Sequence, residues 1–300
     1  MKEEKIKPLK PIIVSIEKLF NDGFINNANL MRLNVFLPFN KIKNTNIYKE
    51  FLKNDSRILI KSKNFSIEIR NRLLTQLHRD VLDILIDLRR SQAVRNKNDN
   101  FTLVITFSKY EILKRLGYKK IGKQTYKWLN KILEELTDVK FTISIKTEGW
   151  TTTGILEKVQ YSKKQKKYMA VFTTDFIRYI DKFDSIFVNY SYFLDDIIKI
   201  KSAETKSFIR HIISNEFKRD KFKNILNELG INTISVGLRQ YQKIKKEIKS
   251  YADILNKIGI EINGDENVLY AKHQKIITKN IGESLPYFSD TELINQNSLH

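Results

Sequence analysis

Apolar and polar positions alternate most clearly in the run FTLVITF, residues 101–107. Large apolar side chains take every second position there, which predicts a short strand with one apolar face. Ser108 follows in the run S-K-Y-E, where its hydroxyl can accept a hydrogen bond from a free amide of the next turn while Glu111 reaches back. We therefore expect a helix to begin at Ser108 and to end near Gly117.

A second helix is predicted for residues 122–138, GKQTYKWLNKILEELTD, because apolar residues recur there at the spacing of a helix packed on a core. These apolar residues are Leu129, Ile132, Leu133 and Leu136. Polar donors occupy the opposite side and its flanks, namely Lys123, Gln124, Thr125, Lys127, Asn130 and Lys131. The first turns of such a helix enter the major groove in helix-turn-helix docking, so we take these six residues as candidate DNA contacts. A solvated basic face on an ordinary amphipathic helix is the alternative.

Three strands of alternating pattern follow this helix. VKFTISIK alternates up to the turn EGWTT, and a second basic turn, KKQKK at Lys163–Lys167, comes further on. Consecutive hairpin turns fall at opposite ends of a sheet, so the two turns cannot flank the same groove. We assign the wing of a winged helix to EGWTT because it directly follows the basic helix, with Trp150 and Thr151 as candidate DNA contacts. KKQKK is interpreted as a solvated turn.

The residues upstream supply the rest of this unit. RILIKSKNFSIEIR, residues 57–70, predicts a hairpin with a basic turn. LLTQLHRDVLDILIDLRR after it predicts the first helix of the unit, with one apolar face. That face holds Leu77, Val81, Ile84, Leu85 and Leu88, while the residues placed away from it are Arg79, Asp80, Asp83 and Asp87. Residues 1–56 are expected to form a partly ordered arm.

The order of helices and hairpin that is predicted for the first unit is repeated further along the chain. Residues 177–200 are rich in aromatic side chains and are interpreted as a packed connection between domains. Two short helices are then expected, the second closed by Gly230, and Ser235 opens one long helix whose apolar stripe continues to Ile258. Its opposite face carries Arg239, Gln240, Lys243 and Lys246. IEINGDENVLYA predicts a hairpin, a short second wing.

These patterns predict an α+β fold with two tandem winged-helix domains, residues 57–195 and 196–279. Two such domains could cover two successive major grooves. Residues 280–300 carry acidic residues and no lysine or arginine after Asn280, so we expect a flexible acidic tail.

The net charge, the absence of cysteine and the lengths of the apolar runs restrict the classes of function that the chain can have. The 300 residues carry a formal net charge of +20, which implies a polyanionic partner, most simply nucleic acid. There is no cysteine, which excludes disulfides and cysteine-ligated zinc. No apolar run approaches the ~20 residues of a membrane span, and the N-terminal residues do not form a signal peptide. We expect a cytoplasmic protein that does not bind a membrane.

Several motifs suggest chemistry but are better explained otherwise. Residues 117–124, GYKKIGKQ, fall one residue short of a phosphate-binding loop and have Gln124 where magnesium needs Ser or Thr, so no cofactor is expected. The four histidines show no metal-ligand spacing, and no metal is expected. His78 and Asp80 are interpreted as surface partners. Tyr190 and Tyr192 could act as strand-transfer nucleophiles, but aromatic core is the better interpretation.

Taken together, IEIRNRLLTQLHRDVLDILIDLRR, GKQTYKWLNKILEEL, the strand pair after it and LRQYQKIKKEIK resemble plasmid replication initiators, especially the TrfA-type branch. The resemblance covers roughly residues 57–271. It implies two winged-helix domains that bind direct repeats (iterons) in double-stranded origin DNA, help to open adjacent AT-rich DNA, and recruit the host initiator and replicative helicase. It matches the DNA-contacting helices to Gly122–Leu136 and Gly237–Lys249.

Other implied partners stay open. Some relatives carry a motif for the sliding clamp with a glutamine and a Leu-Phe pair, and here Leu19 and Phe20 are present without the glutamine. The sequence also does not decide between a monomer and a homodimer. We expect a non-enzymatic initiator whose base readers include Gln124, Lys127, Arg239 and Gln240. A winged-helix transcriptional regulator and a DNA-nicking enzyme that uses Tyr190 or Tyr192 are the alternatives.

Overall fold

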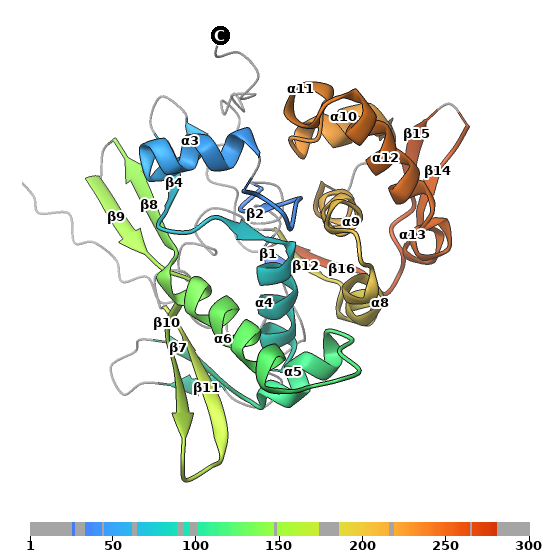
Figure 1. Cartoon of the computed structure of the whole chain (residues 1–300). Coiled ribbons are helices and arrows are strands. Elements are labelled where there is room, and N and C mark those ends of the chain that lie inside the picture. The colour runs from blue at the N-terminus through green and yellow to red at the C-terminus, as the bar shows by residue number, and fades with distance from the viewer. Residues whose placement is uncertain are drawn as a thin grey trace, which may run out of the picture.

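A computed structural model describes most of the chain. The described residues are 26–27, 34–43, 45–61, 65–88, 93–95, 101–146, 149–173, 186–215, 219–264 and 266–280. Within them the chain forms two groups of helices, each with its own small sheets, that lie next to each other (Figure 1). Leu19, Phe20 and the predicted acidic tail lie outside the described residues.

The predicted arm contributes to the core of the first group. Its elements are β1 (Asn26–Asn27), β2 (Phe36–Leu37) and α3 (Asn46–Asn54). The hydroxyl of Thr45 accepts a hydrogen bond from the amide of Tyr48 at 3.2 Å and so caps α3. Five apolar side chains of this segment are buried, namely Val35, Phe36, Leu37, Phe39 and Phe51. The boundary placed at residue 57 therefore separates segments that share one core.

The first group contains the predicted helices in the predicted order. Its elements up to the basic helix are β3 (Ser56–Lys61), β4 (Phe65–Arg70), β5 (Leu74–Thr75), α4 (Gln76–Leu88), β6 (Ala93–Arg95), β7 (Phe101–Phe107), α5 (Lys109–Arg115) and α6 (Lys123–Asp138). Ser108 caps α5, as predicted, because its hydroxyl accepts from the amide of Glu111 at 3.1 Å. Gly117 has a φ of +87°, which suits the turn that separates α5 from α6.

The two hairpins that follow α6 belong to two different sheets of the first group. The hairpin of β8 (Lys140–Ile145) and β9 (Gly149–Thr153) extends the predicted β3–β4 hairpin, in the order β3-β4-β8-β9. The hairpin of β10 (Leu156–Ser162) and β11 (Lys167–Phe172) instead joins the strand before α5, in the order β10-β11-β7-β6. In Figure 1 the two hairpins project toward opposite ends of the molecule.

The second group begins after a short connection and repeats this order. Its elements are η2 (Ser191–Phe193), α8 (Leu194–Lys199), α9 (Ala203–Asn215), β13 (Arg219–Lys221), α10 (Phe222–Glu228), α11 (Thr233–Val236), α12 (Leu238–Lys249), α13 (Ala252–Ile258), β14 (Ile260–Ile262) and β15 (Asn267–Tyr270). The three strands form a sheet in the order β13-β15-β14. The hairpin predicted around the N-G-D turn is thus confirmed as β14 and β15.

The single long helix predicted from Ser235 is wrong. Gly237, with a φ of +77°, separates α11 from α12, and a second break at Ser250 and Tyr251 separates α12 from α13. The apolar stripe stays in phase across the second break, because Ile248, Leu255 and Ile258 are all buried. A periodic pattern alone therefore could not show where the backbone turns.

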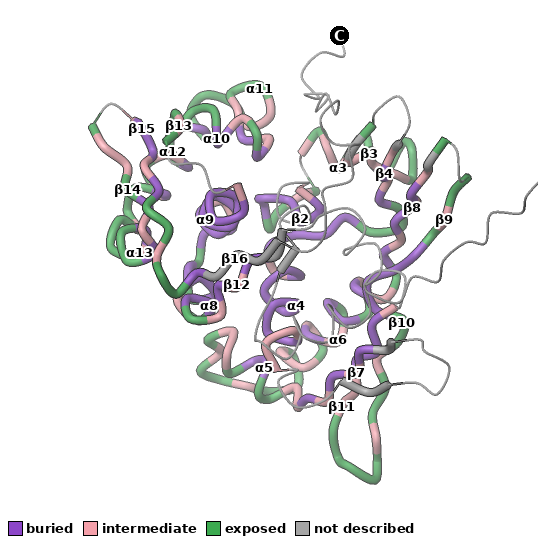
Figure 2. Tube along the Cα trace, turned by 180° about the vertical axis from the view of Figure 1, so that it is seen from behind, coloured by how far each residue is buried: buried purple, intermediate pink, exposed green. Residues whose placement is uncertain are grey.

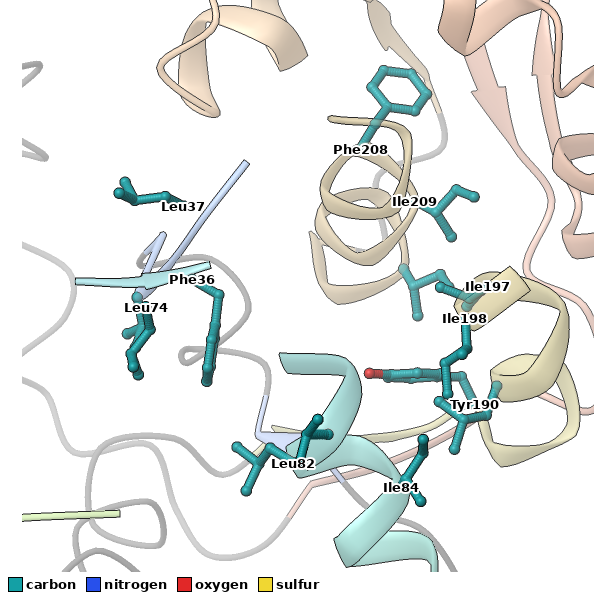
Figure 3. Close-up of a cluster of buried hydrophobic side chains, with 14 of the residues drawn as sticks. Phe36, Leu37, Leu74, Leu82, Ile84, Tyr190, Ile197, Ile198, Phe208 and Ile209 are labelled. Carbon is teal, nitrogen blue, oxygen red and sulfur yellow. The ribbon is translucent and has the colours of Figure 1, made fainter. Parts of the chain in front are cut away.

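Another sheet joins distant parts of the chain. Strand β12 (Ile186–Asn189) pairs with both β1 and β16 (Ile277–Asn280), each antiparallel. Of the connection predicted for residues 177–200, the described part begins at Ile186, and its Tyr190 and Phe193 are buried, as predicted for packed aromatic residues. Figure 3 shows side chains of α4, α8 and α9 converging with Tyr190, and Figure 2 shows buried residues concentrated on α4 and α9.

Candidate nucleic-acid interface

The helix α6 lies on the surface of the first group with its polar side exposed. Leu129, Ile132, Leu133 and Leu136 are buried, which confirms the predicted apolar face. Of the predicted contacts, Lys123, Gln124, Lys127 and Lys131 are exposed, whereas Thr125 and Asn130 are half-buried. The hydroxyl of Thr125 accepts from the amide of Gly122 at 2.9 Å and donates to its carbonyl at 2.8 Å. Thr125 therefore closes the first helical turn, and the long neighbouring side chains remain available to a ligand.

The helix α12 presents the same arrangement in the second group. Its inward side chains, Tyr241, Ile244 and Ile248, are buried. Its predicted contacts, Arg239, Gln240, Lys243 and Lys246, are all exposed. Within the described residues, neither Arg239 nor Lys246 forms an ion pair with an acidic side chain. Both predicted basic helices are thus solvent-accessible.

One acidic residue fixes the second hairpin against α12. Glu266 stands between β14 and β15, and its carboxylate lies 2.7 Å from Nζ of Lys245 and 3.4 Å from Nζ of Lys249. The hydrogen bond from Lys245 is the main reason why the pKa of Glu266 is lowered. These two lysines hold the hairpin in place, whereas the predicted contacts on the same helix do not.

The strand pairing in the second group shows which hairpin of the first group is its wing. There the hairpin after the basic helix pairs with β13, the strand that lies between the first two helices of its unit. The corresponding strand of the first group is β7, and β7 pairs with β11. The wing of the first unit is therefore the β10–β11 hairpin, and its assignment to EGWTT is wrong. The β8–β9 hairpin is an insertion between α6 and the wing.

The revised wing is basic and aromatic. Its turn exposes Lys163, Lys164, Lys166 and Lys167. Tyr161 and Tyr168 pack against each other behind this turn with ring centroids 4.9 Å apart, and Nζ of Lys109 lies 3.8 Å from the centre of the Tyr168 ring. The sequence contained one indication of this role, a lysine-rich turn between two strands with aromatic residues. The choice between the two hairpins required the pairing with β7.

Trp150 and Thr151, predicted from the earlier wing assignment, lie on the edge strand β9. Trp150 is 74% exposed and Thr151 is half-buried. Their strand pairs only with β8 among the described strands, so it is not part of the sheet that carries the wing. A contact of either residue with DNA stays a prediction.

The two basic helices are connected through two buried helices, since α6 packs on α4, α4 packs on α9, and α9 packs on α12. Charged side chains form the junction between α4 and α9. The side of α4 that was predicted to face away from the core is the side that α9 covers. Arg79, Asp80 and Asp83 are consequently buried. This prediction of an outward face was wrong because the covering helix lies more than a hundred residues further along the chain.

The ion pairs at this junction are short. Nη2 of Arg210 lies 2.7 Å from Oδ1 of Asp80 and 2.9 Å from Oδ2 of Asp83. Lys206 also pairs with Asp80, and the hydroxyl of Tyr190 donates to Asp83 at 2.7 Å. Burial, followed by the charge of Asp83, raises the pKa of Tyr190 far above its ordinary value. Tyr190 is therefore part of the core, as predicted, and is unsuited to nucleophilic attack.

Two other predictions about polar residues need correction. Tyr192 is not a core residue: it is 55% exposed, its ring stacks on His273, and Nζ of Lys275 lies 3.5 Å from the ring centre. His78 is not a surface partner of Asp80. Its Nδ1 accepts from the amide of Thr75 at 3.0 Å, and its Nε2 lies 2.9 Å from Oε2 of Glu135.

No group of three histidine, aspartate or glutamate side chains among the described residues is placed to hold a metal ion. No helix of the described part is long and apolar enough to cross a membrane.

A comparison with curated proteins found no match. Among solved structures, the chain is similar to domains 2 and 3 of RctB, determined as selenomethionine derivatives, with 13% identity and a TM-score of 0.45 over 76% of this chain and 91% of that one. It is also similar to RctB residues 155–483, with 12% identity and a TM-score of 0.42 over 75% of this chain and 90% of that one.

The family comparison covers the first unit and continues into α9. Residues 58–213 match the model of the family described as Initiator Replication protein, WH1. This range includes the basic helix α6, the wing β10–β11 and both sides of the charged junction. The chain belongs to this family of winged-helix replication initiator proteins.

Proposed function

We propose that this replication initiator binds direct repeats in double-stranded plasmid origin DNA through α6 and α12 together. The observation that carries the proposal is that two exposed basic helices occupy equivalent places in two winged-helix units. In docked helix-turn-helix proteins the first turns of this helix read base edges in the major groove. Lys123, Gln124 and Lys127 lie in those turns of α6, and Arg239 and Gln240 lie in those of α12.

The charge of the chain supports a phosphate grip. Its formal net charge is +20, and exposed lysines lie on α6, on α12 and on the wing turn between β10 and β11. Lysines that neutralise phosphates release condensed counterions, so the affinity should fall steeply with salt. We therefore assign phosphate contacts to Lys164 and Lys243 and base contacts to Gln124, Lys127, Arg239 and Gln240.

The charged junction supports binding by both units at once. Because Arg210 of α9 is held between two carboxylates of α4, the two units are joined through buried contacts instead of a free linker. A fixed pair of readers is suited to two neighbouring major grooves, whose centres are about 10 base pairs apart on one side of B-form DNA. In the function we propose, this fixed pair binds each repeat and helps to open the adjacent AT-rich DNA, after which the host initiator and helicase are recruited.

A footprint on origin DNA tests the proposal. The full chain should protect two groove segments about one helical turn apart in each direct repeat. A variant with Lys123→Ala and Lys127→Ala should lose protection of one segment, and a variant with Arg239→Ala and Lys243→Ala should lose the other. A shuffled repeat provides the control for specificity. Protection of one palindromic promoter site and of no direct repeat would instead indicate a transcriptional regulator.

We also propose that the chain cuts no DNA. Tyr190 is buried against Asp83, which leaves Tyr192 as the exposed member of the pair considered from the sequence. Supercoiled origin DNA incubated with the full chain and a divalent metal should stay supercoiled. Nicked product that disappears in Tyr192→Phe would contradict this part of the proposal.

A further inference from the structure

Two large apolar side chains are exposed at the leading end of the second basic helix. Ile234, on the single-turn helix α11, is 81% exposed, and Leu238, the first residue of α12, is 65% exposed. Isolated exposed apolar residues are common on protein surfaces and need no explanation by themselves. These two are different because both lie directly before the part of α12 that carries Arg239 and Gln240.

The backbone holds both residues in defined positions. The amide of Asn232 donates to the hydroxyl of Ser235 at 3.1 Å, and the amide of Ser235 donates back to Oδ1 of Asn232 at 2.8 Å. The same hydroxyl donates to the carbonyl of Gly230 at 2.8 Å. Ile231 is fully buried beside this cap. Ile234 is thus exposed on a turn whose backbone is held by the hydrogen bonds of Ser235 to Asn232 and to Gly230.

Gly237 sets the direction of Leu238. Its φ of +77° is one that side chains rarely adopt, and it forms the junction between α11 and α12. Its amide donates to the carbonyl of Thr233 at 2.8 Å, and its carbonyl accepts from the amide of Tyr241 at 2.9 Å. Leu238 lies three positions before the buried Tyr241, at the end of the helix, and is nevertheless exposed.

The charges around the pair indicate what can cover it. Arg239, Lys243 and Lys246 are exposed on the same helix, so a polyanion is favoured over an apolar protein surface. In the major groove, thymine is the base that offers an apolar group, its 5-methyl, and apolar side chains recognise it by contact. The leading turn of α6 differs, because Lys123 and Gln124 are its exposed side chains.

We propose that Leu238 and Ile234 determine sequence specificity by contacting thymine methyl groups, so that the second unit reads methyl groups in addition to the hydrogen bonds that Arg239 and Gln240 form with bases. This inference rests on the proposed DNA-binding function and deepens it. It predicts that affinity depends on the methyl group itself, which uracil lacks.

The test compares thymine with uracil in otherwise identical duplexes. The full chain selects duplexes from a random-sequence pool, and each thymine of a selected duplex is then replaced by uracil in turn. Fluorescence anisotropy should show that the wild type loses about 3- to 5-fold in affinity at one or more positions, as expected for one buried methyl group. Leu238→Ala should bind the thymine and uracil forms equally at one such position, and Ile234→Ala at another.

Leu52→Ala is the matched control, because Leu52 is a similarly exposed leucine on α3. It should keep the full response to uracil, and circular dichroism should show all three variants folded. The inference is overturned if the wild type binds both forms equally at every position, or if Leu238→Ala and Ile234→Ala keep the wild-type response. If the pool yields no enriched duplex, the proposed function fails first and this inference fails with it.

Discussion

Arg210 and Asp80 join the two winged-helix units: Nη2 of Arg210 lies 2.7 Å from Oδ1 of Asp80, and both side chains are almost completely buried. Burial alone would lower the pKa of Arg210, but the charges of Asp83 and Asp80 outweigh it and raise the pKa above its ordinary value. Burial lowers the pKa of Lys206, which pairs with the same Asp80, and the aspartate opposes this change. Arg210 is thus the cation that the junction holds most firmly in its charged form.

Removing one partner of such a buried ion pair strongly destabilises the protein. Replacing a buried ion pair with apolar residues is often neutral, but removing one partner leaves the other charge buried without compensation. We expect Arg210→Met to lower the free energy of unfolding by about 3–5 kcal/mol, measured by urea denaturation. Arg239→Met changes an exposed arginine of the same unit and should stay within about 0.5 kcal/mol of wild type. Equal stability of the two variants would show that the junction contributes nothing.

A contact between His78 of α4 and Glu135 of α6 makes the stability of the protein depend on pH. Nδ1 of His78 accepts a hydrogen bond from the amide of Thr75, so the ring proton lies on Nε2 and is donated to Glu135. This hydrogen bond is the main reason why the pKa of Glu135 is lowered from its ordinary value of 4.5. Between the lowered pKa and 4.5 the unfolded chain binds more protons than the folded one, so stability falls as the pH falls through this range.

Glu135→Gln removes the ionisable group but keeps an oxygen that can accept from His78. We expect its free energy of unfolding to decline less steeply than that of wild type as the pH falls below 4.5, and to differ from it by a constant amount at neutral pH. Glu134→Gln is the control, because this exposed neighbour lies outside the His78 contact. Parallel pH profiles for wild type and Glu135→Gln would contradict the role of this carboxylate.

The sequence predicted local features well and long-range ones poorly. Ser108, Leu129 and Ile244 were placed correctly because capping and helical periodicity depend on neighbours in the chain. Asp83 looked like part of a solvated face because the helix that covers it comes more than a hundred residues later. The wing was misassigned for the same reason, since the two hairpins are distinguished by the pairing of β11 with β7, in which Tyr168 lies opposite Phe107.

The revised wing makes a prediction that separates the two hairpins. A variant with Lys164→Ala and Lys166→Ala removes two exposed charges from the β10–β11 turn. It should weaken binding to repeat and random DNA alike and reduce the slope of log affinity against log salt by about 1 per lysine. Trp150→Ala, on the β8–β9 hairpin, should change the salt slope little because it removes no charge. Loss of binding in Trp150→Ala alone would show that the β8–β9 hairpin, and not the wing, contacts DNA.

The exposed arginine of α12 provides the sharpest test of base reading. Arginine can form paired hydrogen bonds with guanine in the major groove, whereas contacts to phosphates carry no sequence information. We expect Arg239→Ala to lower the affinity for the specific repeat by about 1–3 kcal/mol while affinity for random DNA changes far less, as measured by competition at fixed salt. Lys243→Ala, one helical turn further on, should weaken both duplexes to the same extent because a phosphate contact carries no sequence information. If Arg239→Ala reduces both affinities equally, Arg239 is a phosphate contact, and base reading by α12 must rest on Gln240 and its neighbours.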